Sequence, residues 1–130
     1  MIQFFVIGQW LLATIPNLLM ASLFALSIRA TQFLGKNPNP FDYDPGQIGR
    51  EDALYQFWYA TTDWLLALFI LSLYVWLPWT IITVGVSIWQ LTKGRSQSWI
   101  NSGVGAILVY LLGILLMMVD PNNHFGWYLD

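Results

Sequence analysis

The sequence contains no cysteine and only one histidine, His124, among its 130 residues. The lack of cysteine excludes disulfide bonds, thiolate metal sites and cysteine nucleophiles. Charged residues are scarce, at 9% of the chain, whereas soluble globular domains contain about 25%. The five basic residues form no cluster of the kind that neutralises phosphates, so the sequence disfavours nucleic-acid binding.

Charge is absent altogether from three long runs, residues 1–28, 64–92 and 96–119. A helix needs roughly 20 mostly apolar residues to cross a hydrocarbon core about 30 Å thick, and each run is longer than that. We therefore predict an all-α membrane protein with one membrane-embedded domain over residues 1–130. Its transmembrane helices are expected at about 4–27, 64–91 and 100–119. The first run lacks a basic leading segment and a small-residue cleavage site, which favours a retained span over a signal peptide.

The segment between the first two spans is rich in Pro, Asn and Asp, and its first half is predicted to be a loop. Asp42 and Asp44 only superficially resemble a calcium loop, because the twelfth position from Asp42 is Ala53 rather than Glu. A solvated loop is therefore preferred to a metal site. Residues 51–59 begin with two acids and continue with aromatics, which suits either a short interfacial helix or the aqueous end of the second span.

Small and polar residues recur at every fourth position of the first span. Small residues allow close helix contact, and an amide gains an interhelical hydrogen bond worth about 0.6–2 kcal/mol. The spacing predicts a packing seam, although alanines are common in any membrane helix. Pro16 lies inside this span, where we expect a kink rather than a break. The seam residues in the predicted helix-packing set are Ala13, Asn17, Ala21 and Ala25.

The second span carries a polar stripe formed by Thr80, Thr83 and Ser87, which could bond to a neighbouring helix or return its hydroxyls to its own backbone. Asp63 precedes the charge-free run, and we expect it to cap the helix rather than to form a buried ion site. In the third span Ser102 and Ala106 form a small-x-x-x-small pair that predicts close packing. A tight basic link makes the second and third spans an antiparallel hairpin.

The eight tryptophans are an unusually large number for a chain of this length. Most are assigned to membrane interfaces, where this residue is enriched. Trp76 and Trp79 instead flank Pro78 in mid-span, where they either fill space at a kink or contact a pigment, quinone or haem. Packing is the favoured interpretation. We predict no cofactor site and no metal site, but we expect bound lipid.

The Lys and Arg residues near the ends of the spans point to both possible orientations of the chain in the membrane. We favour a cytoplasmic N-terminus and short link, with the long loop and the aromatic tail on the other side. The tail, residues 122–130, is expected to rest on the membrane surface or on a neighbour. The predicted location is a bacterial cytoplasmic membrane or a derived energy-transducing membrane.

No constellation of nucleophile, acid, base or metal ligands lies within the spans, so the sequence does not predict an enzyme. The spans also lack the ionisable residues that usually mark transport and proton pathways. The leading hypothesis is a small non-catalytic subunit that stabilises a larger respiratory, photosynthetic or transport complex, with other membrane proteins as partners. The alternative is a homo-oligomeric, self-assembling protein such as a pilin-like secretion component or a phage-type pore former.

Overall fold

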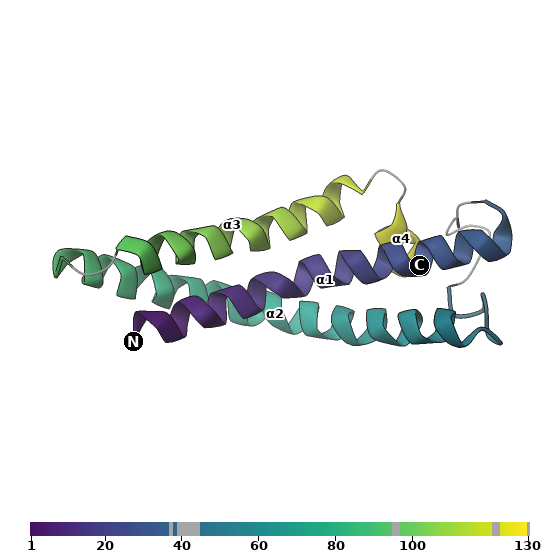
Figure 1. Ribbon diagram of the computed structural model, residues 1–130, viewed down its shortest axis with the longest axis horizontal. Helices are drawn as coiled ribbons and strands as arrows, with labels where there is room; N and C mark the ends of the chain where they lie inside the picture. The colour runs from purple at the N-terminus through teal and green to yellow at the C-terminus, as the bar shows by residue number, and fades with distance from the viewer. Residues whose placement is uncertain (37, 39–44, 95–96, 121–122, 130) are drawn as a thin grey trace.

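The computed structural model describes residues 1–36, 38, 45–94, 97–120 and 123–129, most of which are helical, with no strand among them. The elements are α1 (Ile2–Leu34), α2 (Ala53–Thr92), α3 (Gln97–Val119) and α4 (His124–Leu129) (Figure 1). The first three are long and apolar enough to cross a membrane. This confirms the predicted all-α class and the three candidate spans.

The helices are longer than the predicted spans. α1 continues to Leu34, and α2 begins at Ala53, eleven residues before the predicted start. Residues 53–59 are therefore the first two turns of α2 and not a separate interfacial helix. At 1.5 Å per residue α1 measures about 50 Å and α2 about 60 Å, so both exceed a hydrocarbon core of about 30 Å.

The start of α2 is fixed by Asp52, and not by Asp63 as predicted. The Asp52 carboxylate accepts a hydrogen bond from the Tyr55 N–H at 3.0 Å, which satisfies one of the amides that a helix start leaves unpaired. Asp63 lies three turns further along, where the backbone amides already bond within the helix. The prediction was wrong because the apolar run, which marks the expected membrane segment, starts later than the helix itself.

α1 lies between α2 and α3 and packs against both, while α2 and α3 contact each other little. The chain runs up, down and up, so the N-terminus and the link between α2 and α3 lie at one end (Figure 1). The connection between α1 and α2 and the short α4 lie toward the other end. α2 and α3 are antiparallel, as predicted, but α1 holds them together.

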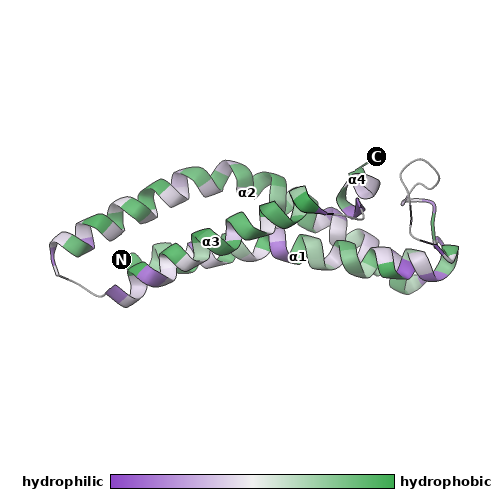
Figure 2. Cartoon of the chain, turned by 90° about the horizontal axis from the view of Figure 1, so that it is seen from above, coloured by the Kyte–Doolittle hydropathy of each residue, from purple (hydrophilic) through white to green (hydrophobic). Residues whose placement is uncertain are grey.

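Both helix-interior prolines lie within continuous helix. α2 also bends partway along its length (Figures 1 and 2). Pro78 accounts for such a bend, because proline lacks an N–H and its ring crowds the preceding turn.

The larger of two core clusters lies where α4 meets α1 and α2. Trp127 is fully buried there, together with Leu23 and Tyr55. The described part of the tail therefore packs onto its own chain, whereas the expectation was that it rests on the membrane surface or on a neighbour. The reason is that α4 turns back after α3 and covers apolar side chains of α1. The smaller cluster, Ile2, Val6 and Ile100, lies toward the opposite end.

The outer surfaces of the three long helices are apolar along most of their length (Figure 2). Large exposed hydrophobic side chains occur on all of them, among them Leu11, Ile81 and Leu108. Water-soluble proteins rarely expose apolar surface so continuously, whereas a surface facing lipid requires it. The fold is compatible with an integral membrane location.

Candidate functional site

The seam between α1 and α2 is closed by polar contacts at several levels. Gln9 donates from Nε2 to Thr80 Oγ1 at 3.0 Å, and Thr62 donates to Ser22 Oγ at 3.0 Å. Ser22 and Thr62 are both buried. In an apolar environment such bonds satisfy groups that water cannot reach, so they fix the depth at which the helices meet.

The seam between α1 and α3 combines hydrogen bonds with close backbone approach. Asn17 donates to the Val109 carbonyl at 3.2 Å, and Trp10 donates to Ser102 Oγ at 2.9 Å. A Cβ atom on Gly113 would lie 2.9 Å from the Pro16 ring, closer than real Cβ atoms come. Glycine is therefore required where α3 crosses the proline of α1.

The structure brings some of the predicted packing residues into these seams and not others. Ala13, Thr83 and Ala106 are fully or almost fully buried. Thr83 and Ser87 return their hydroxyls to carbonyls of their own helix, which was one of the two expectations for the polar stripe. Ala25 is half-buried, and Ala21 is exposed. Four residues make slightly more than one helical turn, so each step of four places the next side chain further around α1. Ala21 therefore no longer faces the seam in which Ala13 lies.

Trp76 and Trp79 both turn toward the chain's own helices. Trp76 stacks on Tyr110 of α3, with ring centroids 4.7 Å apart and planes at 10°. Trp79 donates from Nε1 to the Phe5 carbonyl at 3.0 Å and lies so close to Gly8 that a Cβ atom on Gly8 would clash with the Trp79 ring. These contacts support the packing interpretation of the two tryptophans.

Two buried polar atoms within the described residues lack a hydrogen-bond partner, Gln9 Oε1 and Trp76 Nε1. Next to Trp76, which stacks on Tyr110, the hydroxyls of Ser72 and Tyr110 share a buried hydrogen bond of 3.0 Å between α2 and α3. The mainly apolar interior of the bundle therefore contains several uncharged polar groups.

Titratable groups gather toward the end that carries α4. His124 Nδ1 lies 2.9 Å from Asp120 Oδ1, and the Phe125 amide donates to Asp120 Oδ2 at 2.8 Å. Burial alone raises the pKa of Asp120, but these hydrogen bonds outweigh it and hold that pKa below its usual value. His124 also packs against the Phe24 ring. This arrangement orients α4 and presents no open nucleophile or base.

Arg29 and Asp52 form the main ion pair at the same end. Two hydrogen bonds join the guanidinium to the carboxylate, Nε to Oδ2 at 2.8 Å and the second NH₂ group to Oδ1 at 3.1 Å. The bond from Arg29 lowers the pKa of Asp52, and the Tyr55 amide lowers it further. Because Asp52 also caps α2, this pair ties the end of α1 to the start of α2.

The face of α2 that points away from α1 has no partner within the described chain. It exposes Tyr74, with 76% of its surface accessible. It also exposes Gly85, where an added Cβ atom would have no neighbouring atom within 4 Å. The residues along this face repeat with alternating steps of four and three: Ala67, Leu71, Tyr74, Pro78, Ile81, Gly85 and Ile88. We call this set the α2 outer face.

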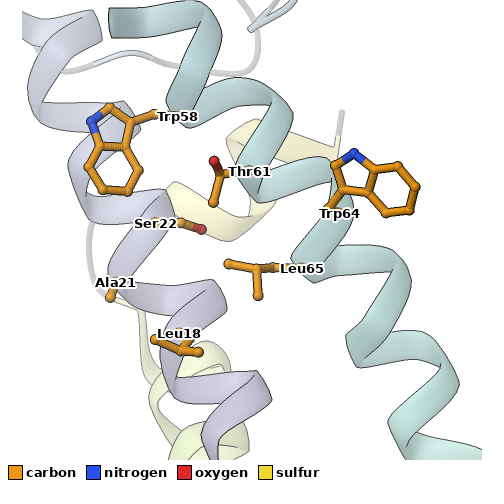
Figure 3. A pocket seen from close by; sticks show the side chains of 7 residues that line it. All are labelled: Leu18, Ala21, Ser22, Trp58, Thr61, Trp64 and Leu65. Atoms are coloured by element: carbon orange, nitrogen blue, oxygen red, sulfur yellow. The ribbon is translucent and has the colours of Figure 1, made fainter.

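A second surface feature is a hollow of about 510 Å³ between α1 and the first half of α2. Figure 3 shows Leu18 and Ser22 of α1 opposite Thr61 and Leu65 of α2. The Trp64 ring projects away from α1 in this view. The lining is almost entirely apolar.

Comparison with protein-family models, with curated proteins and with solved structures finds no match. No group of three or more His, Cys, Asp or Glu side chains within the described residues is arranged to hold a metal ion. Asp42 and Asp44, the residues of the calcium-loop alternative, lie outside the described residues.

Sequence reasoning named Thr83 and Trp76 but missed the repeat to which they belong. α2 places six residues against the bundle at strict intervals of seven: Tyr55, Thr62, Phe69, Trp76, Thr83 and Gln90. This repeat is visible in the sequence and marks the inner face of α2. By contrast, the pairing of Asp63 with Tyr128 leaves no signal in spacing, because it depends on how α4 folds back.

Proposed function

We propose that this chain is a non-catalytic integral membrane subunit that joins other membrane proteins in a larger complex through the α2 outer face. The observation that carries the proposal is Tyr74, an exposed phenol in the middle of an apolar helix. Tyr74 follows Asp63 by eleven positions and precedes Lys93 by nineteen. At 1.5 Å per residue it lies about 16 Å and about 28 Å from these charges, at hydrocarbon depth.

A hydroxyl in hydrocarbon without a hydrogen-bond partner is costly, by about 1–3 kcal/mol on protein-derived scales. Pro78 adds to this cost, because its missing N–H leaves the Tyr74 carbonyl without its regular helical partner. One residue thus offers an unpaired donor and an acceptor toward the lipid side. A neighbouring helix with a hydroxyl or amide at this depth satisfies both.

Shape supports the same conclusion. Gly85 and Ala67 provide small surfaces on the α2 outer face, and Ile81 and Ile88 provide large ones. Alternation of small and large residues allows a second helix to approach closely in the membrane. Within the described residues, the pairs of titratable side chains hold α1, α2 and α4 in place. This favours a structural role over a catalytic one.

The alternative is self-assembly, and the spacing of the α2 outer face favours it specifically. Steps of four and three repeat every seven residues, the pattern by which two like helices pack along their length. In a two-fold pair each Tyr74 meets its own copy, and a hydroxyl both donates and accepts. This arrangement suits a homo-oligomeric protein, of which a secretion component or a pore former is an example.

Cysteine cross-linking in native membranes tests these proposals, because the chain contains no cysteine of its own. Ile81→Cys reports on the α2 outer face, and Leu108→Cys is the matched control on exposed α3 surface. The subunit proposal expects one stoichiometric adduct with a different membrane protein at position 81 only, weakened by Tyr74→Phe. An adduct of twice the chain mass identifies self-assembly. Equal labelling at both positions, with a monomer in mild detergent, contradicts both.

For localisation we propose a bacterial cytoplasmic membrane or a derived energy-transducing membrane, with the N-terminus in the cytoplasm. The N-terminus and the link with Lys93 lie at the same end of the bundle, which supports assigning them to one side. The positive-inside rule favours the cytoplasm for such a short basic link. Protease or thiol-labelling access to each end in sealed vesicles tests this orientation.

A further inference from the structure

We propose that the seam between α1 and the first half of α2 holds one phospholipid with a zwitterionic, primary-amine headgroup. Three hollows follow one another along this seam. The deep hollow of Figure 3 shares Trp58 with a middle hollow of about 260 Å³, and the middle hollow shares Arg29 with a mouth of about 570 Å³. They form one track, which we call the lipid groove.

The deep part of the lipid groove fits a hydrocarbon chain. Leu18 and Leu65 line it with aliphatic surface. The two hydroxyls that border it are already engaged, because Ser22 donates to the Leu19 carbonyl and Thr61 to the Phe57 carbonyl. Neither hydroxyl has a proton left to donate to a polar ligand, and an acyl chain needs none.

The length of the lipid groove matches one leaflet of a bilayer. From Arg29 at the mouth to Leu18 at the deep end the track advances by eleven residue positions along α1. At 1.5 Å per residue this is about 16 Å, half of a hydrocarbon core of about 30 Å. A partner helix would continue across the whole membrane, so a lipid fits this length better.

The mouth carries both signs of charge. Arg29 and Asp52 neutralise each other in their ion pair. Arg50 and Glu51 also line the mouth, and both side chains are exposed. A guanidinium binds phosphate and a carboxylate accepts hydrogen bonds from a primary ammonium. The two together complement a zwitterionic headgroup, whereas an anionic headgroup would meet Glu51 with like charge.

This inference is independent of the proposed subunit role, which rests on residues further along α2, from Ala67 to Ile88. The full-length protein is delipidated in detergent and incubated with equal amounts of phosphatidylethanolamine, phosphatidylcholine and phosphatidylglycerol. Native mass spectrometry then counts the lipids that each chain retains. We expect one phosphatidylethanolamine per chain in clear excess over the other two lipids.

Two sets of variants locate the site. Ala21→Leu fills the deep hollow, and Ala60→Leu adds the same bulk at an exposed alanine of α2 outside the lipid groove. Retention should fall several-fold for Ala21→Leu alone. Glu51→Gln should abolish the preference for phosphatidylethanolamine over phosphatidylcholine, and Arg50→Gln should reduce retention of both. Equal retention in the two leucine variants, or retention without headgroup preference, overturns the proposal. So does a protein helix that cross-links to position 21 in native membranes.

Discussion

The Tyr128 hydroxyl donates a hydrogen bond to the Asp63 carboxylate and so joins the last helix of the chain to the interior of α2. Tyr128 lies in a six-residue helix that has no stability of its own, since isolated helices need about 12–15 residues even in favourable sequences. Burial raises the pKa of Tyr128, and the neighbouring Asp63 carboxylate raises it further, so the phenol stays protonated and remains a donor. The bond holds α4 against the bundle together with the buried Trp127.

We predict that Tyr128→Phe and Asp63→Asn each loosen α4 without unfolding the three long helices. A hydrogen bond to a charged group contributes about 1.5–3 kcal/mol, and partial exposure of Asp63 places the effect at the low end. Amide exchange of α4 should accelerate, while helicity by circular dichroism stays constant. The double variant should cost little more than either single variant, because both remove the same bond. Additive losses would show that the two side chains act separately.

The ion pair of Arg29 and Asp52 predicts a pH-dependent start of α2. Arg29 lowers the pKa of Asp52 in the folded state, so the contribution of the carboxylate is present above the unfolded value of about 3.9. It is lost as the pH falls through the lower folded value. Protection of the Tyr55 amide, corrected for intrinsic exchange, should follow this titration.

Arg29→Gln removes the largest cause of the lowered pKa, so the Asp52 midpoint should move to higher pH and Tyr55 protection should fail earlier in an acid titration. The carboxyl carbon shift of Asp52 measures the midpoint directly. Lys36→Gln is a suitable control for a simple change in net charge. An unchanged midpoint in Arg29→Gln would mean that the guanidinium does not hold the carboxylate in the membrane-mimetic environment.

The number of long helices and the all-α class were predictable because they depend on length and charge alone. The spans predicted from the runs without charge lie inside α1, α2 and α3, which are long and apolar enough to cross a membrane. The ends of the helices were not predictable in the same way. α2 begins at Ala53 because Asp52 caps it, well before the charge-free run, where charge does not separate helix from loop.

The packing seams were predictable only in part. Asn17 and Ala13 lie where α1 contacts its neighbours, because the early members of the series at every fourth position face inward. Ala21 follows by the same rule, yet the helix has rotated it outward. Gly113 was missed because its role depends on meeting Pro16 of another helix, and no spacing within α3 reveals that crossing.

That crossing supports a direct comparison between two glycines of similar helical context. A Cβ on Gly113 would lie 2.9 Å from both Cβ and Cγ of Pro16, a rigid ring that cannot rotate away. Overpacking of this kind costs about 1–3 kcal/mol. Gly85 is exposed with nothing within 4 Å of its built Cβ, so alanine there adds helix propensity without a clash.

Gly113→Ala should therefore lower the thermal unfolding temperature in detergent micelles, whereas Gly85→Ala should leave it equal or raise it. The helix-propensity gain of about 1 kcal/mol applies to both variants, so their difference isolates the contact with Pro16. Restoring space with Pro16→Ala in the Gly113→Ala background should recover part of the loss. If the two single variants unfold at the same temperature, α1 and α3 do not meet as closely as 2.9 Å implies. The seam would then depend on the Asn17 hydrogen bond instead.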